Sequence, residues 1–543
     1  MRSALKDLAS LVRRPHSIGV IRLRPAPRRI SVFVALLMAT CALHSAPRPN
    51  IVMIISDDMG YSDLGCYGGE IETPHLDRLA AGGLRFANYY SNNMCVVARA
   101  SLMTGCYPGV AKQGSSLSRH CVTAPELLRQ AGYTTLMSGK WHLSEEGREG
   151  SPNDRGFDHW YGTYLGAGSF FTPASLSRDD KNVEHEFRED PDYYYTDAIT
   201  DNAIAFLNDA HKESPDKPFF LYLAYTAAHW PLHAKAEDIA HYKGRYSMGW
   251  DELRKQRHAR QLKMGLVDSK WPLSPRHAQV PAWRDEEHKA WQERRMEVYA
   301  AQVTSMDRNI GRVVDLLRSR GQLENTLILY QNDNGGCHVE YTENRKGAYL
   351  PEKTRDGRPV IPGNRPDIMP GPENTYQSYG YGWANASNTP FRLFKQHDHE
   401  GGIRSPLIAH WPRGIAARGD ITRQVCHVTD LLPTFIELAG ANYPETFKGN
   451  KIGPHVGRSL VAALQGGEAP ERSTYFWKHA RGKAVRVDDW KLVSENRKPW
   501  ELYRLTPDGT ELNNLVETNP EKAAELKKRF EDWDKRTNRK KKK

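Results

Sequence analysis

Apolar runs alternate along this chain with amphipathic stretches. Residues 50–55, 219–224 and 326–330 are continuous apolar runs, which is the pattern of strands covered on both faces. The stretches between them have helical periodicity and begin at helix-start signals such as Thr73-Pro74 and the capping box at residues 123–126. Strand–helix alternation of this kind predicts an α/β fold, with a large mixed, mostly parallel sheet flanked by helices on both faces. The expected helices cover residues 74–81, 124–130, 196–207 and 287–320, and a further strand covers residues 133–137.

The last part of the chain has a different pattern. Four short alternating runs follow residue 467 and predict a small antiparallel sheet, against which a helix over residues 520–533 would pack. We therefore expect a main domain over residues 47–466, a smaller C-terminal domain over residues 467–534 and a basic tail over residues 535–543. The four runs are residues 473–477, 484–487, 490–493 and 500–503.

The first 46 residues have the pattern of an export signal. Arg28 and Arg29 precede an apolar run over residues 30–39, and small residues lead from there to Ala46. A basic region, a short apolar region and a plausible cleavage site indicate a periplasmic or extracellular protein. The apolar run is too short to span a bilayer comfortably, and no second run has that length, so we expect no stable membrane partner.

The basic balance of the chain is concentrated at its two ends. The formal net charge is +11, but residues 1–46 hold eight lysines and arginines with one acid, and residues 535–543 hold seven with none. The body between them therefore has a net charge of −3. Since nucleic-acid binding needs basic groups gathered on the folded surface, the total charge gives no reason to expect a nucleic-acid partner.

Chemically versatile side chains lie at or near the ends of the predicted strands. In an open α/β sheet these ends meet along one edge, where ligands bind, so residues far apart in the sequence are expected to converge there. A single aspartate in such a place is usually a turn former or a helix cap, but a set of seven is harder to explain in that way. The seven are Asp57, Asp58, Lys140, His142, His229, Asp333 and Asn334.

The acidic members of this set suggest a metal site. Asp57, Asp58, Asp333 and Asn334 offer hard oxygen ligands, which suit Ca²⁺ or, less well, Mg²⁺. Three carboxylates crowded together would repel one another unless a cation neutralised them. Carboxylates around a cation, ringed by basic groups, form a site for a tetrahedral oxyanion ester. The basic candidates are Arg99, Lys140, His142, His229 and Lys395.

Cys95 lies where a polar segment meets a short Ala/Leu/Met run. The run is expected to form a helix closed by Gly105, which places Cys95 at or just before a helix N-terminus. Free backbone N–H groups and the helix dipole favour negative charge there. The alternative is a small buried thiol with no chemical role. Arg99 follows four residues later.

The segment 93–105 resembles the signature of the type I formylglycine-dependent sulfatases. In that signature, Cys-x-(Pro/Ala)-x-Arg marks a cysteine that is oxidised to formylglycine, also called 3-oxoalanine; Val97 stands where the family has Pro or Ala. Other blocks follow in the family's order over nearly all of the chain, and they look most like the bacterial arylsulfatase branch of the alkaline phosphatase-like superfamily. These blocks are residues 49–60, 73–77, 139–142, 228–230, 332–335 and 400–404.

The resemblance implies hydrolysis of sulfate monoesters, either aryl sulfates or sulfated carbohydrates, to an alcohol and inorganic sulfate. It also implies that a formylglycine-generating enzyme acts on Cys95. In the family's pattern the modified residue binds Ca²⁺ and, once hydrated, is the nucleophile. The implied roles are Ca²⁺ binding for Asp57, Asp58, Asp333 and Asn334, support of the formylglycine for Arg99, sulfate binding for Lys140 and Lys395, proton removal for His142 and protonation of the leaving alcohol for His229.

Two other functions remain open from the sequence. A phosphate-ester hydrolase on the same fold would share the metal carboxylates but would carry Ser or Thr in place of Cys95. A non-catalytic binder of sulfated glycans would result if Val97 prevented the modification. Residues 242–291, rich in Trp, Arg and His, are interpreted either as a substrate-shaping insertion or as a solvated surface excursion.

Overall fold

The computed structural model describes residues 48–538, except residues 417, 481 and 496–497. The expected export signal over residues 1–46 and the end of the basic tail, residues 539–543, lie outside the described residues. The first four residues of the expected tail, 535–538, belong to the last helix, α15 (Pro520–Asn538). In the described ranges, no helix combines the length and the apolar character needed to cross a membrane.

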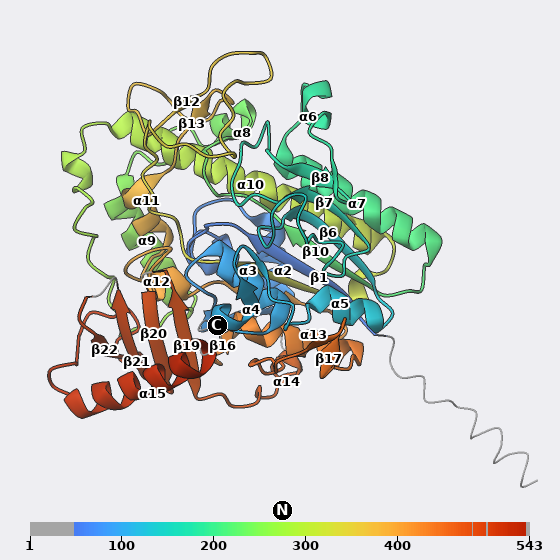
Figure 1. Cartoon of the computed structure of the whole chain (residues 1–543). Helices are drawn as coiled ribbons and strands as arrows, with labels where there is room; N and C mark the ends of the chain where they lie inside the picture. The colour runs from blue at the N-terminus through green and yellow to red at the C-terminus, as the bar shows by residue number, and fades with distance from the viewer. Residues whose placement is uncertain (1–47, 417, 481, 496–497, 539–543) are drawn as a thin grey trace, which may run out of the picture. The chain divides into compact units, whose positions relative to one another are not determined.

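A mixed sheet forms the centre of the described chain (Figure 1) and has ten strands there. Strand β1 (Asn50–Ser56) pairs in parallel with β10 (Phe219–Ala224) on one side and β11 (Thr326–Asn332) on the other. Strand β6 (Thr134–Lys140) extends the parallel part beyond β10. The predicted mixed, mostly parallel centre is thus confirmed. The remaining strands lie toward the edges: β2 (Leu84–Phe86), β14 (Leu407–His410) and β15 (Asp420–Thr422) beyond β11, and β7 (His159–Thr163), β8 (Leu176–Arg178) and β9 (Lys181–Asn182) beyond β6.

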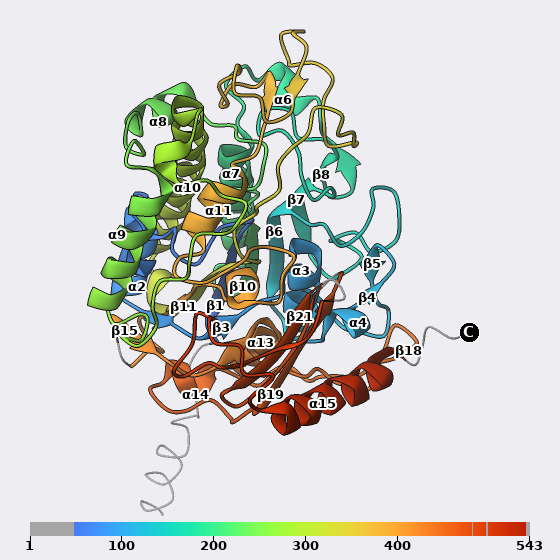
Figure 2. The same cartoon turned by 90° about the vertical axis from the view of Figure 1, so that its left-hand side faces the viewer.

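Alternate side chains of β1 enter two different hydrophobic cores, because successive residues of a strand point to opposite faces of the sheet. Val52 and Ile54 belong to one core, and Ile51, Met53 and Ile55 belong to the other. Figure 2 shows α2 and α10 on one side of the sheet and α3 on the other. The first core is covered by α2 (Pro74–Ala81), α7 (Tyr195–Glu213) and α10 (Lys289–Ser319), and the second by α3 (Cys95–Thr104), α5 (Ala124–Gln130) and α13 (Leu431–Ala439).

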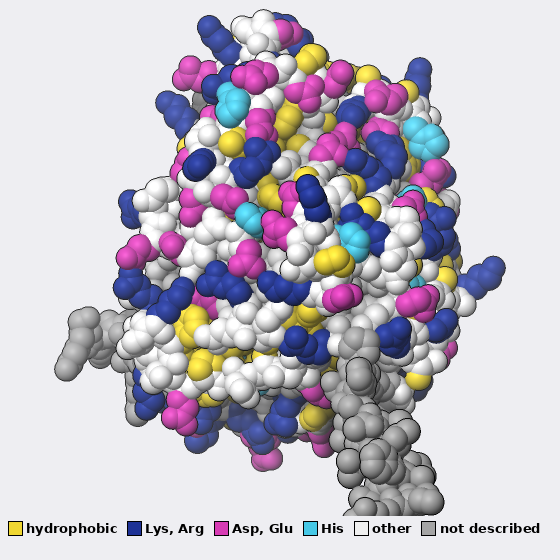
Figure 3. All heavy atoms as spheres, turned by 90° about the vertical axis from the view of Figure 1, so that its right-hand side faces the viewer, with side chains coloured by type: hydrophobic (Ala, Val, Ile, Leu, Met, Phe, Trp, Pro, Cys, Tyr) yellow, Lys and Arg dark blue, Asp and Glu magenta, His cyan; other side chains and the backbone are white. Residues whose placement is uncertain are grey.

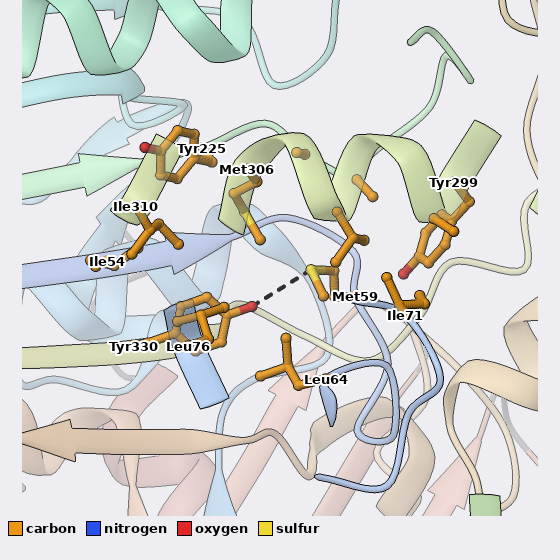
Figure 4. Close-up of a cluster of buried hydrophobic side chains, with 14 of the residues drawn as sticks. Ile54, Met59, Leu64, Ile71, Leu76, Tyr225, Tyr299, Met306, Ile310 and Tyr330 are labelled. Atoms are coloured by element: carbon orange, nitrogen blue, oxygen red, sulfur yellow. Dashed lines mark hydrogen bonds between the residues drawn. The ribbon is translucent and has the colours of Figure 1, made fainter. Parts of the chain in front are cut away.

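Helix α10 supplies much of the first core. Figure 4 shows Met306 and Ile310 of α10 above Ile54 of β1 and Tyr330 of β11. The Tyr330 hydroxyl lies 2.9 Å from Asn332 Oδ1 and from Ser56 Oγ, and 3.6 Å from the sulfur of Met59, so its polar end is satisfied at the edge of the apolar layer. Full burial of side chains of this size stabilises the fold by about 1.5–3 kcal/mol each. The predicted helix over residues 287–320 agrees with α10 to within two residues.

The C-terminal strands form a separate four-stranded antiparallel sheet with α15 against one face (Figure 1, red). This confirms the predicted second sheet. Its other face meets the main part of the molecule through a small apolar cluster that includes Tyr90, Ile403 and Trp477. The strands are β19 (Thr474–His479), β20 (Gly482–Val487), β21 (Trp490–Glu495) and β22 (Glu501–Arg504).

A buried lysine connects this C-terminal sheet to the main part. Lys491 of β21 has no exposed surface, and its Nζ atom lies 2.7 Å from Glu400 and 2.8 Å from Glu511. Glu400 begins α12 (Glu400–Ile403) and also pairs with Arg404 at 3.1 Å. Removing one partner from such a buried set would leave an uncompensated charge, so the cluster strongly constrains how the two parts join.

Residues 242–291 are packed into the main part of the molecule. Helix α9 (Gly249–Lys263) lies in this segment, and its Arg257 side chain is fully buried. The Arg257 guanidinium contacts Asp63 at 2.6 Å and Glu70 at 2.8 Å, in the loop that follows β1. A solvated surface excursion, one of the two interpretations of this segment, is therefore wrong.

The connections contain short ribbons and short helices of four to eight residues that the periodicity of the sequence did not predict. The ribbons pair β3 (Tyr89–Tyr90) with β16 (Cys426–His427), β4 (Lys112–Gln113) with β5 (Ser116–Leu117), β12 (Ile361–Pro362) with β13 (Thr375–Tyr376), and β17 (Thr446–Phe447) with β18 (Asn450–Lys451). The helices are α4 (Pro108–Ala111), α6 (Glu186–Glu189), α8 (Ala236–His241), α11 (Gly380–Ser387) and α14 (Val461–Leu464).

Charged side chains of both signs are interspersed over the face of the molecule in Figure 3. The residues described on this face do not form a continuous basic patch. This mixture agrees with the small net charge of the chain body, as opposed to the strongly basic ends.

Candidate active site

The ends of β1 and β11 bring four oxygen-bearing side chains together. Asp57 and Asp58 follow β1, and Asp333 and Asn334 follow β11, the strand beside it. The backbone N–H of Asp58 donates to Asp333 Oδ1 at 3.2 Å, and Asn334 Nδ2 donates to Asp58 Oδ1 at 2.8 Å. All four side chains are buried. The parallel register of the two strands explains this meeting of residues that are nearly 280 positions apart.

Strands β6 and β10 supply basic groups to the same edge. Lys140 is the last residue of β6, which extends beyond the predicted end at residue 137, so Lys140 lies inside the strand and not past it. Its Nζ atom contacts the Asp57 carboxylate directly. His229 follows β10, and its Nε2 atom lies 3.3 Å from Asp58 Oδ2. His229 Nδ1 faces the carbonyl oxygen of Trp230 at 2.6 Å.

Cys95 occupies the first position of α3, as expected, and α3 ends at Gly105 with φ 63°. The thiol is 4% exposed, and burial raises its pKa. Its Sγ atom lies 3.5 Å from Nδ1 of His142. Ligand atoms of Cys95, Asp57 and Asp333 all lie within 4.8 Å of one another.

Arg99 and Lys395 complete the set. Arg99, one turn along α3 from Cys95, is fully buried and places its guanidinium 3.1 Å from Asp333 Oδ2. Lys395 comes from the loop between α11 and α12, and its Nζ atom lies 2.5 Å from Asp58 Oδ1. All ten residues singled out from the sequence therefore lie in one connected cluster, in which nine are buried and His142 is half-buried.

The charges of this cluster strongly affect one another. Burial disfavours the charged form of Asp57, but Lys140, His229 and Arg99 overcome that effect and hold its pKa far below the ordinary value. Burial, reinforced by the neighbouring Asp57, raises the pKa of Asp333 to about 7. Burial also lowers the pKa of His229 to about 4. The His142 pKa is lowered as well, by burial and then by Lys140. Such strongly perturbed groups are typical of functional sites.

The oxygen atoms of this cluster fit a divalent cation. Within the described part of the chain, Asp57 Oδ1, Asp58 Oδ2 and Asn334 Oδ1 are buried and accept no hydrogen bond; the contact of Asp58 Oδ2 with His229 Nε2 at 3.3 Å lacks hydrogen-bond geometry. Buried polar atoms rarely stay unsatisfied, so these three atoms need a ligand that accepts lone pairs. Carboxylate and amide oxygens are the ligands of hard cations such as Ca²⁺ and Mg²⁺. A metal ion at this place would involve Asp57, Asp58, Asp333, Asn334 and residue 95.

Two site residues have a backbone conformation that is unusual for their side chains. Asp58 has φ 62° and His142 has φ 59°, both in the left-handed region. Residues other than glycine seldom adopt it, and it persists where the surrounding structure imposes it, most often at functional sites. The sequence alone gave no signal for this strain.

A cleft of about 810 Å³ opens onto the cluster and contains residues that the sequence reasoning missed. Cys95, His142, His229 and Lys395 line its deep end. Trp230, Arg345, Tyr349 and Gly166 line other parts of it. Trp230 could have been suspected because it follows His229, whereas Arg345 and Tyr349 lie in a loop with no pattern that marks them.

None of the residues lining this cleft comes from residues 242–291. The interpretation of that segment as a substrate-shaping insertion is therefore wrong for this cleft. The physical reason is its anchoring: Arg257 ties α9 to Asp63 and Glu70, a position from which α9 supports the loop after β1.

Comparison with known proteins agrees with the fold and the site. The sulfatase family matches residues 49–441, so the chain belongs to this family. It is a sulfuric ester hydrolase of the alkaline phosphatase-like superfamily. A second family description, N-sulphoglucosamine sulphohydrolase, C-terminal, matches residues 391–536.

Individual relatives cover most of the chain. An arylsulfatase of Klebsiella aerogenes is 32% identical over 466 residues, which is 80% of this chain and 96% of the relative. An uncharacterised sulfatase of Schizosaccharomyces pombe is 32% identical and covers 88% of this chain and 92% of its own length. A solved structure described as a complex with its substrate D-glucosamine-2-N,6-O-disulfate has a TM-score of 0.58 at 23% identity, over 91% of this chain and 99% of that one.

Proposed function

We propose that this enzyme hydrolyses sulfate monoesters with a formylglycine hydrate made from Cys95 and with a bound Ca²⁺. One observation carries the proposal: ligand atoms of Cys95, Asp57 and Asp333 lie within 4.8 Å of one another, in a buried cluster where three oxygen atoms accept no hydrogen bond from a described residue and where basic side chains contact the carboxylates. An acid-rich pocket of this kind is stable only when cations balance it. Membership of the sulfatase family supports the same chemistry.

Each basic residue has a place consistent with its proposed role. Lys140 and Lys395 contact Asp57 and Asp58, so their ammonium groups stand at the rim of the carboxylate cluster, where sulfate oxygens would lie. Arg99 lies in α3 one turn after Cys95, and its guanidinium contacts Asp333, which holds this end of the helix against the carboxylate cluster. A bound Ca²⁺ would neutralise the carboxylates and offset the negative charge of the sulfate. Loss of one such electrostatic group typically costs about 3 kcal/mol, or roughly a hundredfold in rate.

The two histidines have different proposed tasks. His142 Nδ1 lies 3.5 Å from the sulfur of Cys95, so this imidazole faces residue 95 and would take a proton from the hydrated aldehyde. His229 stands beside Asp58, lines the cleft close to Cys95 and would protonate the departing alcohol. A hydrated aldehyde has one hydroxyl for attack and a second whose deprotonation expels sulfate and restores the aldehyde, whereas a serine would stop at a stable sulfo-ester.

We propose a sulfated carbohydrate or an aryl sulfate as the substrate. The cleft is wide enough for a sugar ring, at about 810 Å³, and one structural neighbour is described as bound to a sulfated glucosamine. We also propose that residues 1–46 direct export, that a formylglycine-generating enzyme converts Cys95, and that residues 47–466 and 467–534 are the catalytic and C-terminal domains.

Two measurements test this function. Mass spectrometry of the peptide around Cys95, from protein made in its native host, is expected to show formylglycine. The same protein is expected to hydrolyse 4-nitrophenyl sulfate faster than 4-nitrophenyl phosphate, and Cys95→Ala is expected to lose this activity. An unmodified thiol would favour a sulfated-glycan binder, and a preference for the phosphate ester would favour a phosphate-ester hydrolase.

A further inference from the structure

Arg345 is a cation of the cleft that is held by aromatic rings. Its guanidinium lies 4.8 Å from the ring centroid of Trp230 and 5.1 Å from that of Tyr341. Its Nε atom donates to the Tyr349 hydroxyl at 3.2 Å. These three contacts fix the plane of the guanidinium while the side chain remains only half-buried. Aromatic stacking of this kind pre-organises an arginine without neutralising it.

The charge of Arg345 has no carboxylate partner within the described part of the chain. Its terminal nitrogens likewise make no hydrogen bond to another described residue. By contrast, the acidic residues that line the same cleft are already engaged. Glu145 pairs with Arg148 at 2.8 Å, Glu146 accepts from Asn182 at 3.3 Å, and Glu184 accepts from the backbone N–H of Ser175 at 2.8 Å. The guanidinium of Arg345 therefore lines the cleft as a positive charge that no described carboxylate neutralises.

Arg345 lies on the side of the cleft where the leaving group of the substrate is expected. Trp230, on which Arg345 stacks, directly follows His229, and the two rings lie with centroids 4.4 Å apart. If His229 protonates the leaving oxygen, the group bonded to that oxygen extends toward Trp230. Arg345 thus stands on the leaving-group side of the cleft, whereas Lys395 lines its sulfate end, where it contacts Asp58.

We propose that Arg345 binds a second anionic group on the leaving-group part of the substrate, which makes multiply charged sulfated saccharides the preferred substrate class. The inference rests on the proposed function, because it assigns the leaving-group side from the role of His229. A planar guanidinium binds sulfate or carboxylate oxygens in pairs, with charge-assisted hydrogen bonds that are roughly twice as strong as neutral ones. The second group is therefore a sulfate or a carboxylate.

Two pairs of substrates show whether the second anionic group is a sulfate or a carboxylate. The first pair is D-glucosamine 6-O-sulfate and D-glucosamine-2-N,6-O-disulfate, which differ by a second sulfate. The second pair is sulfated N-acetylgalactosamine linked to a glucose and the same sugar linked to a glucuronate, which differ by a carboxylate. The proteins are the full-length enzyme, Arg345→Gln, and the control Lys346→Gln, which removes an exposed neighbouring charge that does not line the cleft.

The wild-type enzyme is expected to have the lower KM for the doubly charged member of at least one pair. Arg345→Gln is expected to raise that KM about tenfold or more, the usual effect of losing a hydrogen bond between charged groups, with little change in kcat. The KM for the singly charged member, and all constants of Lys346→Gln, are expected to stay near wild type. The pair that responds identifies the second group. Equal effects on both members of each pair, or no effect at all, would overturn the proposal.

A binding measurement separates this inference from the proposed function. If the wild-type protein turns over no sulfate ester, the proposed function fails, and calorimetric titration with the same sugars still tests Arg345. Weaker binding of a doubly charged sugar to Arg345→Gln than to the wild type, with unchanged binding of its singly charged partner, supports the site. Unchanged binding of every sugar contradicts it.

Discussion

The Nδ1 atom of His142 lies 3.5 Å from the sulfur of Cys95, although the two residues are 47 positions apart. Two features hold the imidazole in this place. The backbone of His142 adopts φ 59°, and Gly166 packs against its ring so closely that a β-carbon there would lie 2.2 Å from His142 Cε1. The orientation of a proposed base thus depends on a glycine that the sequence did not single out.

Gly166→Ala is expected to displace the His142 ring and lower kcat by about tenfold or more, because small misplacements of reacting groups are costly. Steady-state kinetics with 4-nitrophenyl sulfate measure the effect. Gly168→Ala is the matched control, since the nearest atom to a β-carbon there is 3.7 Å away. Equal kinetics for the two variants would show that His142 does not need this support.

His229→Ala is expected to discriminate between leaving groups. A sugar alcohol needs a proton as it leaves, whereas 4-nitrophenolate does not, so the variant should lose about a hundredfold or more in kcat with a sulfated sugar and much less with 4-nitrophenyl sulfate. Exposed His241→Ala serves as the control. The same loss with both substrates would contradict the role of His229 as a proton donor.

Removal of metal is expected to destabilise the protein. Ca²⁺ bound to Asp57, Asp58, Asp333 and Asn334 would stabilise the folded state by about 2.7 kcal/mol at a hundred times its Kd, so chelation should lower the Tm and Ca²⁺ should restore it more fully than Mg²⁺. Asp333→Asn should abolish most of this shift, while exposed Asp315→Asn should retain it. If neither the chelator nor Ca²⁺ changes the Tm of the wild-type protein, the prediction that this site binds a metal ion is wrong.

Arg257→Met is expected to lower the free energy of unfolding by about 3–5 kcal/mol, because it leaves the Asp63 carboxylate buried without its charged partner and removes one of the two arginines that pair with Glu70. Lys255→Met, on the exposed face of the same helix, should change it by less than about 0.5 kcal/mol. Denaturant titrations of both variants give these values. Similar stabilities would mean that α9 is not anchored by this cluster.

Asp398 is expected to make stability depend on pH. Burial raises its pKa to about 7, against an ordinary value of 3.8, and neither carboxylate oxygen has a hydrogen-bond partner among the described residues that meets normal geometry. The folded state therefore holds a proton that the unfolded chain releases between pH 4 and 7, so the free energy of unfolding falls as pH rises through this window, by at most about 4 kcal/mol.

Asp398→Asn should remove this contribution and flatten the stability profile between pH 4 and 7. Denaturation at several pH values, at constant Ca²⁺, measures the slope. Exposed Asp209→Asn is the control and should follow the wild type. A profile for Asp398→Asn as steep as that of the wild type would assign the pH dependence to other groups.

The strands whose sequences form uninterrupted apolar or alternating runs could be predicted from the sequence. β1, β10 and β11 are uniform apolar runs, and Asp57 and Asp333 meet because the carboxyl ends of adjacent parallel strands share an edge. The C-terminal sheet followed from its alternating runs in the same way. The roles proposed for the site residues remain predictions, although the structure gathers them all in one cluster.

Other parts of the fold and the site depend on contacts between distant residues, which the periodicity of the sequence does not predict. Lys395 reaches Asp58 from a loop, so only the family resemblance pointed to it. The edge strand β15 and its neighbour β2 are three residues long, too short for a recognisable pattern. Arg345 acquires its position from the rings of Trp230 and Tyr341, which are more than 100 residues apart.

The Lys491 cluster also has a consequence for biosynthesis. Glu400 lies 91 residues before Lys491 in the chain, so it leaves the ribosome well ahead of the ammonium group that neutralises it. The active-site half of the protein cannot reach its final packing during that interval. Final packing of the active-site part against the C-terminal sheet therefore requires that the last strands have already been synthesised.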